Sequence, residues 1–338
     1  MKKKNRRMNP KKNCKRNSKA KKGALIGIGA ALALTAVDAA AARLAFSMAM
    51  ERKSLIAYEP SKEHMGTQNI ELADGQKSMW ESPWIRNFTD DVYITSEDGL
   101  KLHARTAKNG DSHKWIINCH GYRGNCIETG NTGKHFSEKG YNTLTPDARG
   151  HGKSEGKYVT MGWSDRRDIV LWSRWILEQD EAAEIVLYGC SMGGATVMMA
   201  SGEKDLPDNV KCIVEDCGYT SVWDQFESEL HSLFHLPAFP LLYTADIICL
   251  KKCGFTFKKA SAVKQVSKCK VPMLFIHGTD DKFVPFKMLR RVYNACTVEK
   301  EIMQVEGAGH ALSGYVNEEE YWKKIDGFVD KYIGNLKI

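Results

Sequence analysis

The stretch that most constrains the fold runs from Ile185 to Ala200, where IVLYG is followed by Cys-Ser-Met-Gly-Gly and then by an apolar segment. The apolar run before Gly189 predicts a buried strand, and the segment after Ser191 predicts a helix. Glycines at 189 and 193 lack a Cβ, so strand and helix can approach closely enough to turn sharply at Ser191. This stretch leaves two interpretations of Ser191 open: a nucleophile projecting from a sheet edge, or a cap of the helix.

From residue 91 onward the sequence alternates predicted strands with predicted helices. The first two strands, joined by Glu-Asp-Gly, form a hairpin, and the later ones are short apolar runs that end in glycine or a polar loop. The predicted strands cover 91–96, 100–107, 114–121, 141–146, 184–189, 210–217, 271–278 and 300–305, and the predicted helices cover 133–140, 163–179, 193–203, 286–296 and 318–333. This alternation predicts an α/β fold with a mostly parallel, doubly wound, eight-stranded sheet and helices on both faces.

One region, residues 219–268, breaks this alternation. It contains no predicted strand and is rich in apolar and aromatic residues, namely Leu230, Leu233, Phe234, Leu236, Phe239, Leu241, Leu242 and Tyr243. A helix buried in the main core is one explanation, but Pro237 and Pro240 would interrupt a continuous core helix. We therefore predict a small helical cap over the sheet edge, close to Ser191, with apolar walls suited to acyl chains.

A nucleophilic serine needs a base, and the base needs an acid that orients it. The sequence HGTDDKFVP places Asp280 and Asp281 directly after a predicted strand, and GAGH places His310 in the loop after the last strand. The carboxyl ends of parallel strands are where such sheets carry their chemistry. The order serine, aspartate, histidine therefore predicts a catalytic triad.

Two backbone N–H groups are candidates to hold the oxyanion that forms when a serine attacks a carbonyl. The N–H of Met192 opens the helix after the turn, and that of Tyr122 follows His120 and Gly121 in HGYRGN. Cys190 precedes the centre of the turn by one position, so we expect its thiol to point away from the substrate.

Five stretches carry a resemblance to a known family: HGYRGN, PDARGHGKSEG, GCSMGG, HGTDDKFVP and GAGH. From about residue 91 to the C-terminus the chain resembles the α/β-hydrolase superfamily. It is most similar to bacterial membrane-anchored or secreted serine hydrolases of the lysophospholipase and acylaminoacyl-peptidase group. The resemblance implies Ser191 as nucleophile, Asp281 as acid and His310 as base, because the family pattern places the acid at the fifth position of HGxxD. It implies a structural role for Asp147, and it makes Asp216, at the end of the strand 210–217, a second-choice acid because some members place the acid there.

The implied reaction is two-step hydrolysis of carboxylic esters through an acyl-enzyme on Ser191, with neither a metal nor an organic cofactor. Apolar or lipid-like esters are the favoured substrate class. A peptidase or amidase is an alternative, although peptidases of similar fold usually carry a large N-terminal β-domain for which this chain has no room. An acyltransferase with the same residues and a non-catalytic binding module on a hydrolase fold also stay open.

The net charge of +8 comes from the N-terminus, because residues 2–22 hold twelve Lys and Arg and no acid, which leaves the remainder near −4. A nucleic-acid partner is therefore not expected. Residues 23–37 carry no charge, and a basic arm before an apolar stretch is typical of a membrane anchor or an export signal.

The predicted organisation is a basic cytoplasmic arm at 1–22, an apolar transmembrane or signal-anchor helix at 23–50, a lead-in at 51–90 and the hydrolase domain at 91–338. The expected location is the cell membrane, spanned once, with the catalytic domain outside. The alternatives are secretion after cleavage in the alanine-rich stretch that follows Val37, or a tail that leads into an ordinary amphipathic helix. The sequence predicts no oligomeric state.

Ten cysteines are present without a CxxC motif or other metal-ligand spacing. Cys249, Cys253 and Cys269 could supply a disulfide if the domain lies in an oxidising compartment.

Overall fold

The computed structural model describes residues 34–56, 61–65 and 82–334. Eight strands form one sheet: β1 (Asp90–Thr95), β2 (Lys101–Ala107), β3 (Lys114–Cys119), β4 (Asn142–Pro146), β5 (Glu184–Cys190), β6 (Val210–Asp216), β7 (Met273–Gly278) and β8 (Lys300–Val305). Their order across the sheet is β1-β2-β4-β3-β5-β6-β7-β8. β2 pairs antiparallel with both β1 and β4, and every other pairing is parallel. The predicted eight-stranded, mostly parallel sheet is confirmed.

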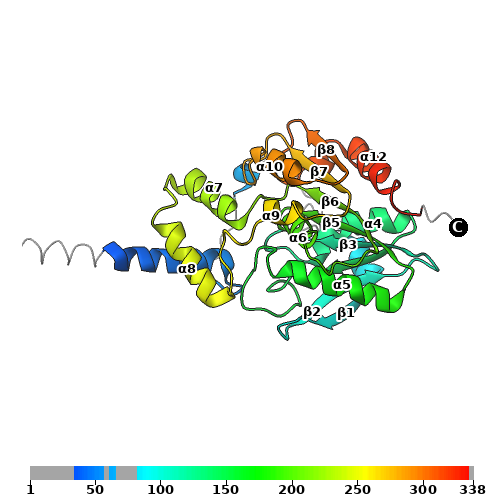
Figure 1. Ribbon diagram of the computed structural model, residues 1–338, viewed down its shortest axis with the longest axis horizontal. Helices are drawn as coiled ribbons and strands as arrows, with labels where there is room; N and C mark the ends of the chain where they lie inside the picture. Colours follow the sequence, from blue (N-terminus) through cyan, green and yellow to red (C-terminus); the bar gives the residue numbers. More distant parts are fainter. Residues whose placement is uncertain (1–33, 57–60, 66–81, 335–338) are drawn as a thin grey trace, which may run out of the picture.

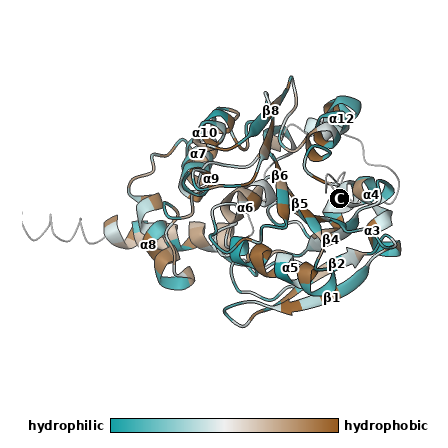
Figure 2. Cartoon of the chain, turned by 45° about the vertical axis from the view of Figure 1, so that its right-hand side comes forward, coloured by the Kyte–Doolittle hydropathy of each residue, from teal (hydrophilic) through white to brown (hydrophobic). Residues whose placement is uncertain are grey.

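Helices cover both faces of this sheet (Figure 1). One face carries α4 (Gly130–Glu138) and α12 (Glu318–Val329), and the other carries α5 (Asp165–Gln179), α6 (Met192–Ala200) and α10 (Lys287–Ala295). Strand side chains alternate between these layers, because successive residues of a strand point to opposite faces. In β3, for example, Trp115 and Ile117 face the α5 and α6 layer, whereas Ile116 faces α4 and α12. Figure 2 shows the hydrophobic segments of the central strands enclosed between these helices.

The shorter helices lie at the ends of the sheet or in connections. They are α2 (Lys62–Met65), α3 (Pro83–Asn87), the 3₁₀ turn η1 (Cys126–Thr129) and α11 (Ser313–Val316). α3 belongs to the predicted lead-in and packs on α4, where a Cβ on Gly133 would lie 2.8 Å from the Trp84 ring. The bulky indole therefore requires a glycine at that point of α4.

The predicted cap contains three helices, of which two leave the body. α7 (Val222–Phe234) and α8 (Leu241–Cys253) project beyond the sheet (Figure 1). α9 (Ala262–Val266) returns to the body and packs against α6 and α10. The part of 219–268 that forms a cap is thus the α7–α8 pair.

A helix over residues 34–50 lies beside α8 and packs on the body (Figure 1). Ala42, Phe46 and Met50, four residues apart and therefore on one helix face, are buried in the main core. After the helix, the Arg52 guanidinium donates to the backbone carbonyls of Gly152 and Ser154 at 2.6 and 2.5 Å. This part of the predicted anchor segment is a component of the folded body.

Within the described ranges, every helix is either too short or too polar to cross a bilayer. The expectation of an apolar N-terminal spanning helix is therefore not met by residues 34–50, which use one helix face to cover the main core. Residues 1–33, with the predicted basic arm and the first part of the predicted anchor, lie outside the described residues.

Candidate active site

Ser191 lies at the sharp turn between β5 and α6, with φ 57° and ψ −117°. A Cβ on Gly189 would fall 2.2 Å from the carbonyl oxygen of Gly193, and one on Gly193 would fall 2.1 Å from that of Cys119, so both positions require glycine. The Ser191 side chain makes no capping hydrogen bond to α6. Its interpretation as a helix cap is excluded, and its strained backbone is of the kind that collects at functional sites.

The Ser191 hydroxyl and two side chains from distant loops form a hydrogen-bonded chain. His310 Nε2 lies 2.8 Å from Ser191 Oγ, and His310 Nδ1 lies 2.7 Å from Asp281 Oδ2. Asp281 comes from the turn after β7 and His310 from the loop after β8, as the sequence predicted for strand ends. The structure therefore brings the three predicted residues together in the order Asp281, His310, Ser191.

The Asp281 carboxylate is held by its own turn. Its Oδ1 accepts hydrogen bonds from the backbone N–H groups of Phe283 and Val284 at 3.0 and 2.8 Å. Burial alone would raise the pKa of Asp281, but the charge of His310 and hydrogen bonds from His277 and His310 hold it below its usual value. Burial alone would lower the pKa of His310, but the Asp281 carboxylate raises it above its usual value.

The other candidates from the sequence have different surroundings. Asp216 accepts hydrogen bonds from Ser313 at 3.1 Å and from the Tyr321 hydroxyl at 2.9 Å, and burial raises its pKa. Asp280 is exposed to solvent. Cys190 faces Cys217 at 3.8 Å between sulfurs, so its thiol is directed into the protein rather than into the cavity that contains Ser191. None of these three side chains is hydrogen-bonded to Ser191.

The backbone N–H groups of Met192 and Tyr122 are free to bind a ligand atom. In the described part of the chain, neither group donates to a backbone or side-chain acceptor. Gly121 lies against the serine, since a Cβ there would be 3.6 Å from Ser191 Cβ. The β3 loop and the first turn of α6 thus flank Ser191, as an oxyanion site requires.

Comparison with known proteins agrees with this geometry. A family model described as alpha/beta hydrolase fold matches residues 114–235, and one described as serine hydrolase (FSH1) matches residues 188–312. Together these matches span β3 to the loop that carries His310. The chain belongs to the α/β-hydrolase superfamily. It is a serine hydrolase.

Curated proteins and solved structures match most of the chain. Protein YqkD of Bacillus subtilis is 28% identical over 238 residues, which are 70% of this chain and 78% of YqkD. The lysophosphatidylserine lipase ABHD12 of Danio rerio is 22% identical over 64% of this chain and 61% of its own length. The Pyrococcus furiosus esterase Pf2001 has a similar fold, with a TM-score of 0.60 and 24% identity over 73% of this chain and 92% of its own.

In this hydrolase two neutral histidines hold the β3 loop in place. His120 donates from Nδ1 to the Gly121 carbonyl at 2.7 Å and accepts the Ala148 N–H at 3.0 Å. His151 accepts the Arg123 N–H at 3.2 Å, and burial lowers the pKa of His151 to about 3. An uncharged imidazole keeps the lone pair that this bond needs, so His151 positions the peptide next to Tyr122.

The same loop is fastened to the end of the helix over 34–50. The Tyr122 hydroxyl donates to the Ala49 carbonyl at 2.8 Å, and the Arg123 guanidinium donates to the Met48 carbonyl at 2.7 Å. These carbonyls lie in the last helical turn, where they lack intrahelical partners. Sequence reasoning missed this connection. The available signal was the four-residue spacing of Ala42, Phe46 and Met50, but the sequence analysis interpreted these apolar residues as part of a membrane anchor.

His277 is a second residue that the sequence analysis missed. It precedes Gly278 in HGTDD, is fully buried, and donates from Nε2 to the Val284 carbonyl at 2.9 Å. The same Nε2 lies 3.2 Å from Asp281 Oδ2. His277 therefore braces the turn that presents Asp281 to His310.

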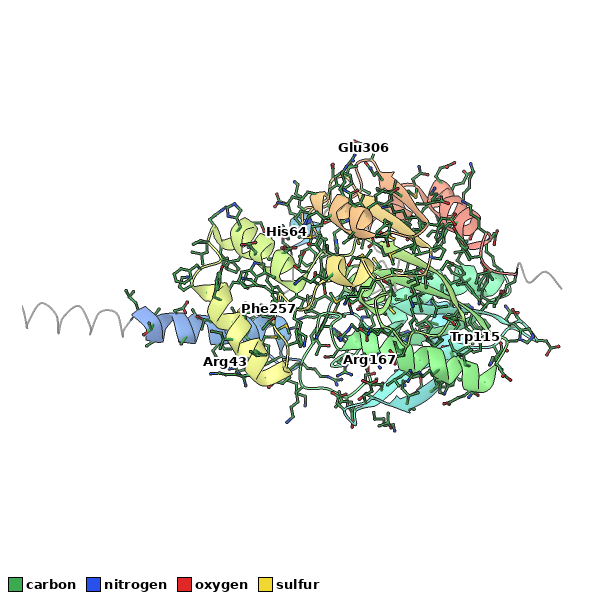
Figure 3. The ribbon with its side chains drawn as sticks, viewed as in Figure 1. Arg43, His64, Trp115, Arg167, Phe257 and Glu306 are labelled. Carbon is green, nitrogen blue, oxygen red and sulfur yellow. The ribbon has the colours of Figure 1, made fainter. Side chains whose placement is uncertain are left out.

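Ser191 opens into an apolar cavity of about 150 Å³. The N-terminal helix contributes Ala45, Phe46, Met48 and Ala49, and the cap contributes Phe226, Leu230, Leu233, Phe234, Leu241, Leu242 and Ala245. Figure 3 labels Phe257, another lining residue, where the cap meets that helix. Leu236, Phe239 and Tyr243, which the sequence placed among the apolar walls, do not line the cavity and are exposed. Both the cap and the N-terminal helix thus enclose the reaction site.

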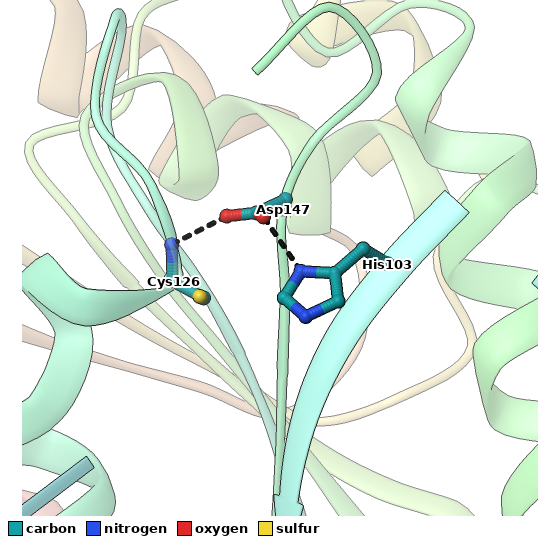
Figure 4. A group of neighbouring side chains, drawn as sticks. All are labelled: His103, Cys126 and Asp147. Carbon is teal, nitrogen blue, oxygen red and sulfur yellow. Dashed lines mark hydrogen bonds and ion pairs between the residues drawn. The ribbon is translucent and has the colours of Figure 1, made fainter. Parts of the chain in front are cut away.

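A second buried aspartate–histidine pair lies on the antiparallel side of the sheet (Figure 4). His103 Nδ1 is 2.7 Å from Asp147 Oδ2, and Asp147 also accepts the backbone N–H groups of Cys126 and Lys153, each at 2.8 Å. His103 Nε2 lies 3.0 Å from Asp91. The pair joins β1 and β2 to the end of β4 and to the segments that carry Cys126 and Lys153, which agrees with the structural role implied for Asp147.

Among the residues that the structure describes, two groups have the residue types of a metal site: His103, Cys126 and Asp147, and Cys217, Asp281 and His310. In each group both imidazole nitrogens already face a hydrogen-bond partner. The nine described cysteines, including Cys249, Cys253 and Cys269, are free thiols.

Proposed function

We propose that this serine hydrolase cleaves carboxylic esters with apolar acyl chains through an acyl-enzyme on Ser191. The observation that carries the proposal is the hydrogen-bonded chain from Asp281 through His310 to Ser191, which ends in an apolar cavity. ABHD12 of Danio rerio is named as a lysophospholipid lipase, and the structural neighbours include named esterases. These names support an ester substrate.

In the proposed mechanism His310 takes the proton of the Ser191 hydroxyl through Nε2 while Ser191 Oγ bonds to the carbonyl carbon. Asp281 keeps the Nδ1–H of His310 in place and stabilises the imidazolium that forms. The N–H groups of Met192 and Tyr122 donate to the oxyanion. His310 then returns the proton to the departing alkoxide, leaving an acyl-serine. A water attacks this ester by the same sequence and regenerates Ser191.

The cavity sets the expected acyl length. An apolar cavity of about 150 Å³ is the size that accommodates benzene, which has six carbons. Each methylene buried contributes roughly 0.8 kcal/mol, or about a fourfold gain in kcat/KM where the gain is fully expressed in the transition state. We therefore expect kcat/KM to rise from acetyl to about hexanoyl esters and to level off beyond that length.

The test combines active-site labelling with a chain-length series. A fluorophosphonate probe should label the parent protein and fail to label Ser191→Ala, because labelling requires an activated serine. p-Nitrophenyl esters from C2 to C12 should show the predicted rise in the parent. Leu233→Ala should reduce hexanoate turnover more than acetate turnover, since Leu233 lines the cavity. Phe239→Ala, which leaves the cavity lining intact, is the matched control. Labelling of the folded Ser191→Ala variant would contradict the proposed nucleophile, and a flat series would contradict the acyl preference.

We also propose that the enzyme works at the cell membrane, with residues 23–33 as part of its anchor and the catalytic domain outside. The basic arm at 2–22 supports this orientation. Cleavage in the alanine-rich stretch after Val37 would cut the helix whose last turns line the cavity, which favours retention over removal. Fractionation of intact cells and treatment with external protease test the proposal. Full-length protein in the cytosol would contradict it.

A further inference from the structure

Large apolar side chains are exposed on the cap and on the first described turns of the N-terminal helix. On the helix Leu34 and Val37 are 71% and 68% exposed, and on the cap Phe239 and Phe234 are 70% and 57% exposed. Ile247 and Leu250 of α8 are also exposed. We call this set, Leu34, Val37, Phe234, Phe239, Ile247 and Leu250, the cap face. Such a concentration of apolar surface marks an interaction site.

The cap face belongs to elements that are joined to one another. The Thr244 hydroxyl of α8 donates to the Asp38 carboxylate of the N-terminal helix at 2.6 Å. Figure 1 shows α8 crossing that helix at the end of the molecule away from the C-terminus, and Figure 2 shows hydrophobic segments on both. The two helices therefore present their exposed side chains as one unit.

The cap face also borders the cavity that contains Ser191. Phe234 lines the cavity and is at the same time more than half exposed, so it marks the opening. Leu241 and Ala245 of α8 line the cavity from the inner side of the helix that bears Ile247 and Leu250. A partner on the cap face would lie directly at the entrance for substrate.

Lysines are concentrated at the end of α8 and just after it. Lys251 and Lys252 lie in its last turn, and Lys258 and Lys259 follow shortly after. Two acids beside the cap face are occupied by hydrogen bonds, Asp38 to Thr244 and Asp246 to the Phe257 N–H, whereas Glu227 of α7 is exposed. Toward the N-terminus the helix continues in sequence into the apolar residues 23–33 and the basic arm at 2–22. An apolar surface rimmed by lysine is complementary to a bilayer that contains anionic lipids.

We propose that the cap face docks on the surface of an anionic bilayer, so that membrane-borne esters enter the cavity past Phe234. This inference rests on the proposed function for the substrate, but docking itself does not require catalysis. It adds to an N-terminal anchor a second attachment that fixes the orientation of the enzyme. A second copy of this chain is the competing occupant, which the following experiment distinguishes.

The first test is hydrogen–deuterium exchange on the full-length Ser191→Ala variant, which removes turnover from the measurement. Vesicles of phosphatidylcholine with about 30% phosphatidylglycerol are added and compared with pure phosphatidylcholine vesicles. Peptides over 234–250 should gain protection with anionic vesicles, whereas peptides over β1 and α11 should not change. Protection confined to residues before 42 would overturn the proposal. Protection at 234–250 that depends on protein concentration without vesicles would assign the face to a second copy.

The second test uses paired variants of the full-length enzyme in the active form. Phe239→Ser with Ile247→Ser removes apolar area from the cap face without touching the cavity lining. Phe88→Ser with Tyr315→Ser, which are also exposed, removes comparable area elsewhere. The first pair should lower kcat/KM for a hexanoyl ester embedded in anionic vesicles at least about fivefold and leave a soluble butyrate unchanged, as expected from lost interfacial area. The control pair should change neither rate. Docking would be contradicted if both double variants lost the same kcat/KM on the embedded ester, or if the cap-face double variant lost none. Failure to hydrolyse either ester would instead contradict the proposed function.

Discussion

The molecule contains two buried aspartate–histidine pairs with the same 2.7 Å separation between Nδ1 and carboxylate, and each has a cysteine close by. In one pair, Asp281 and His310, the second imidazole nitrogen faces the Ser191 hydroxyl at 2.8 Å. In the other, Asp147 and His103, it faces the Asp91 carboxylate at 3.0 Å. The two pairs therefore differ in the group that faces Nε2, which is a hydroxyl for His310 and a carboxylate for His103.

That difference decides the chemistry of each pair. Both nitrogens of His103 face carboxylate oxygens, so within the described residues His103 has no hydroxyl group within hydrogen-bond reach whose proton it could take. His310 has one carboxylate partner and one hydroxyl partner, so its Nε2 can accept the hydroxyl proton. An aspartate–histidine contact alone is thus insufficient to indicate a base. A catalytic base is distinguished from a structural histidine by the group that faces its Nε2 and by whether that group opens into a cavity.

The largest expected effect separates the two aspartates. Asp281→Asn should lower kcat by about 10⁴-fold, because an amide stabilises the wrong His310 tautomer and cannot offset the imidazolium charge. Asp147→Asn should lower kcat less than about tenfold and reduce the free energy of unfolding by about 3 kcal/mol, because it breaks a buried charged network. Ester hydrolysis and urea unfolding of both variants provide the measurements.

Asp216→Asn and Asp280→Asn are the controls for this comparison, since neither side chain bonds to His310. A greater loss of activity in Asp216→Asn than in Asp281→Asn would move the acid to the end of β6. Equal loss in Asp281→Asn and Asp147→Asn would mean that the two pairs do not differ in role.

A smaller effect concerns the pH dependence of the reaction. The Asp281 carboxylate raises the pKa of His310, and only the neutral imidazole can take the serine proton, so activity is lost as pH falls through that raised pKa. Removing the charge in Asp281→Asn lowers the His310 pKa. The acid limb of kcat/KM should therefore move toward lower pH by about one to two units. In Asp147→Asn the acid limb of kcat/KM should lie at the same pH as in the parent protein. A profile from pH 4 to 10 with an activated ester tests both, and an unshifted limb in Asp281→Asn would contradict the assignment of His310.

The sequence predicts the sheet from its strand and turn patterns, and it predicts the site because Ser191, Asp281 and His310 each lie in a recognisable motif at a strand end and follow one another in the expected order. It does not predict the His103–Asp147 pair, since its members lie 44 residues apart and no motif links His103 to a partner. The sequence likewise does not predict that residues 42–50 pack on the body, because their apolar character indicated a membrane anchor. An apolar segment satisfies a bilayer and a protein core equally well, so composition cannot choose between them. Phe239 is the opposite case. Its apolar character predicted a position in the cavity wall, whereas the structure exposes it to solvent.

The smallest expected effect belongs to Asp91, the residue that occupies the far nitrogen of His103. Its carboxylate also pairs with Arg105 at 3.1 Å and with Lys153, and its side chain is about one-third exposed. The hydrogen bond from Lys153, together with His103, holds the pKa of Asp91 below its usual value despite partial burial. A carboxylate with a lowered folded-state pKa stabilises the protein above its unfolded pKa, and that contribution disappears as pH falls through the folded value. Asp91→Asn should therefore lower the free energy of unfolding by less than about 1 kcal/mol at pH 7, as is usual for partly exposed ion pairs, and by still less at pH 3. Ester turnover should stay within about twofold of the parent. Urea unfolding at both pH values measures the stability difference. A loss as large as that of Asp147→Asn would show that the outer carboxylate, rather than the inner one, holds His103 in place, and a clear loss of turnover would connect this pair to the reaction.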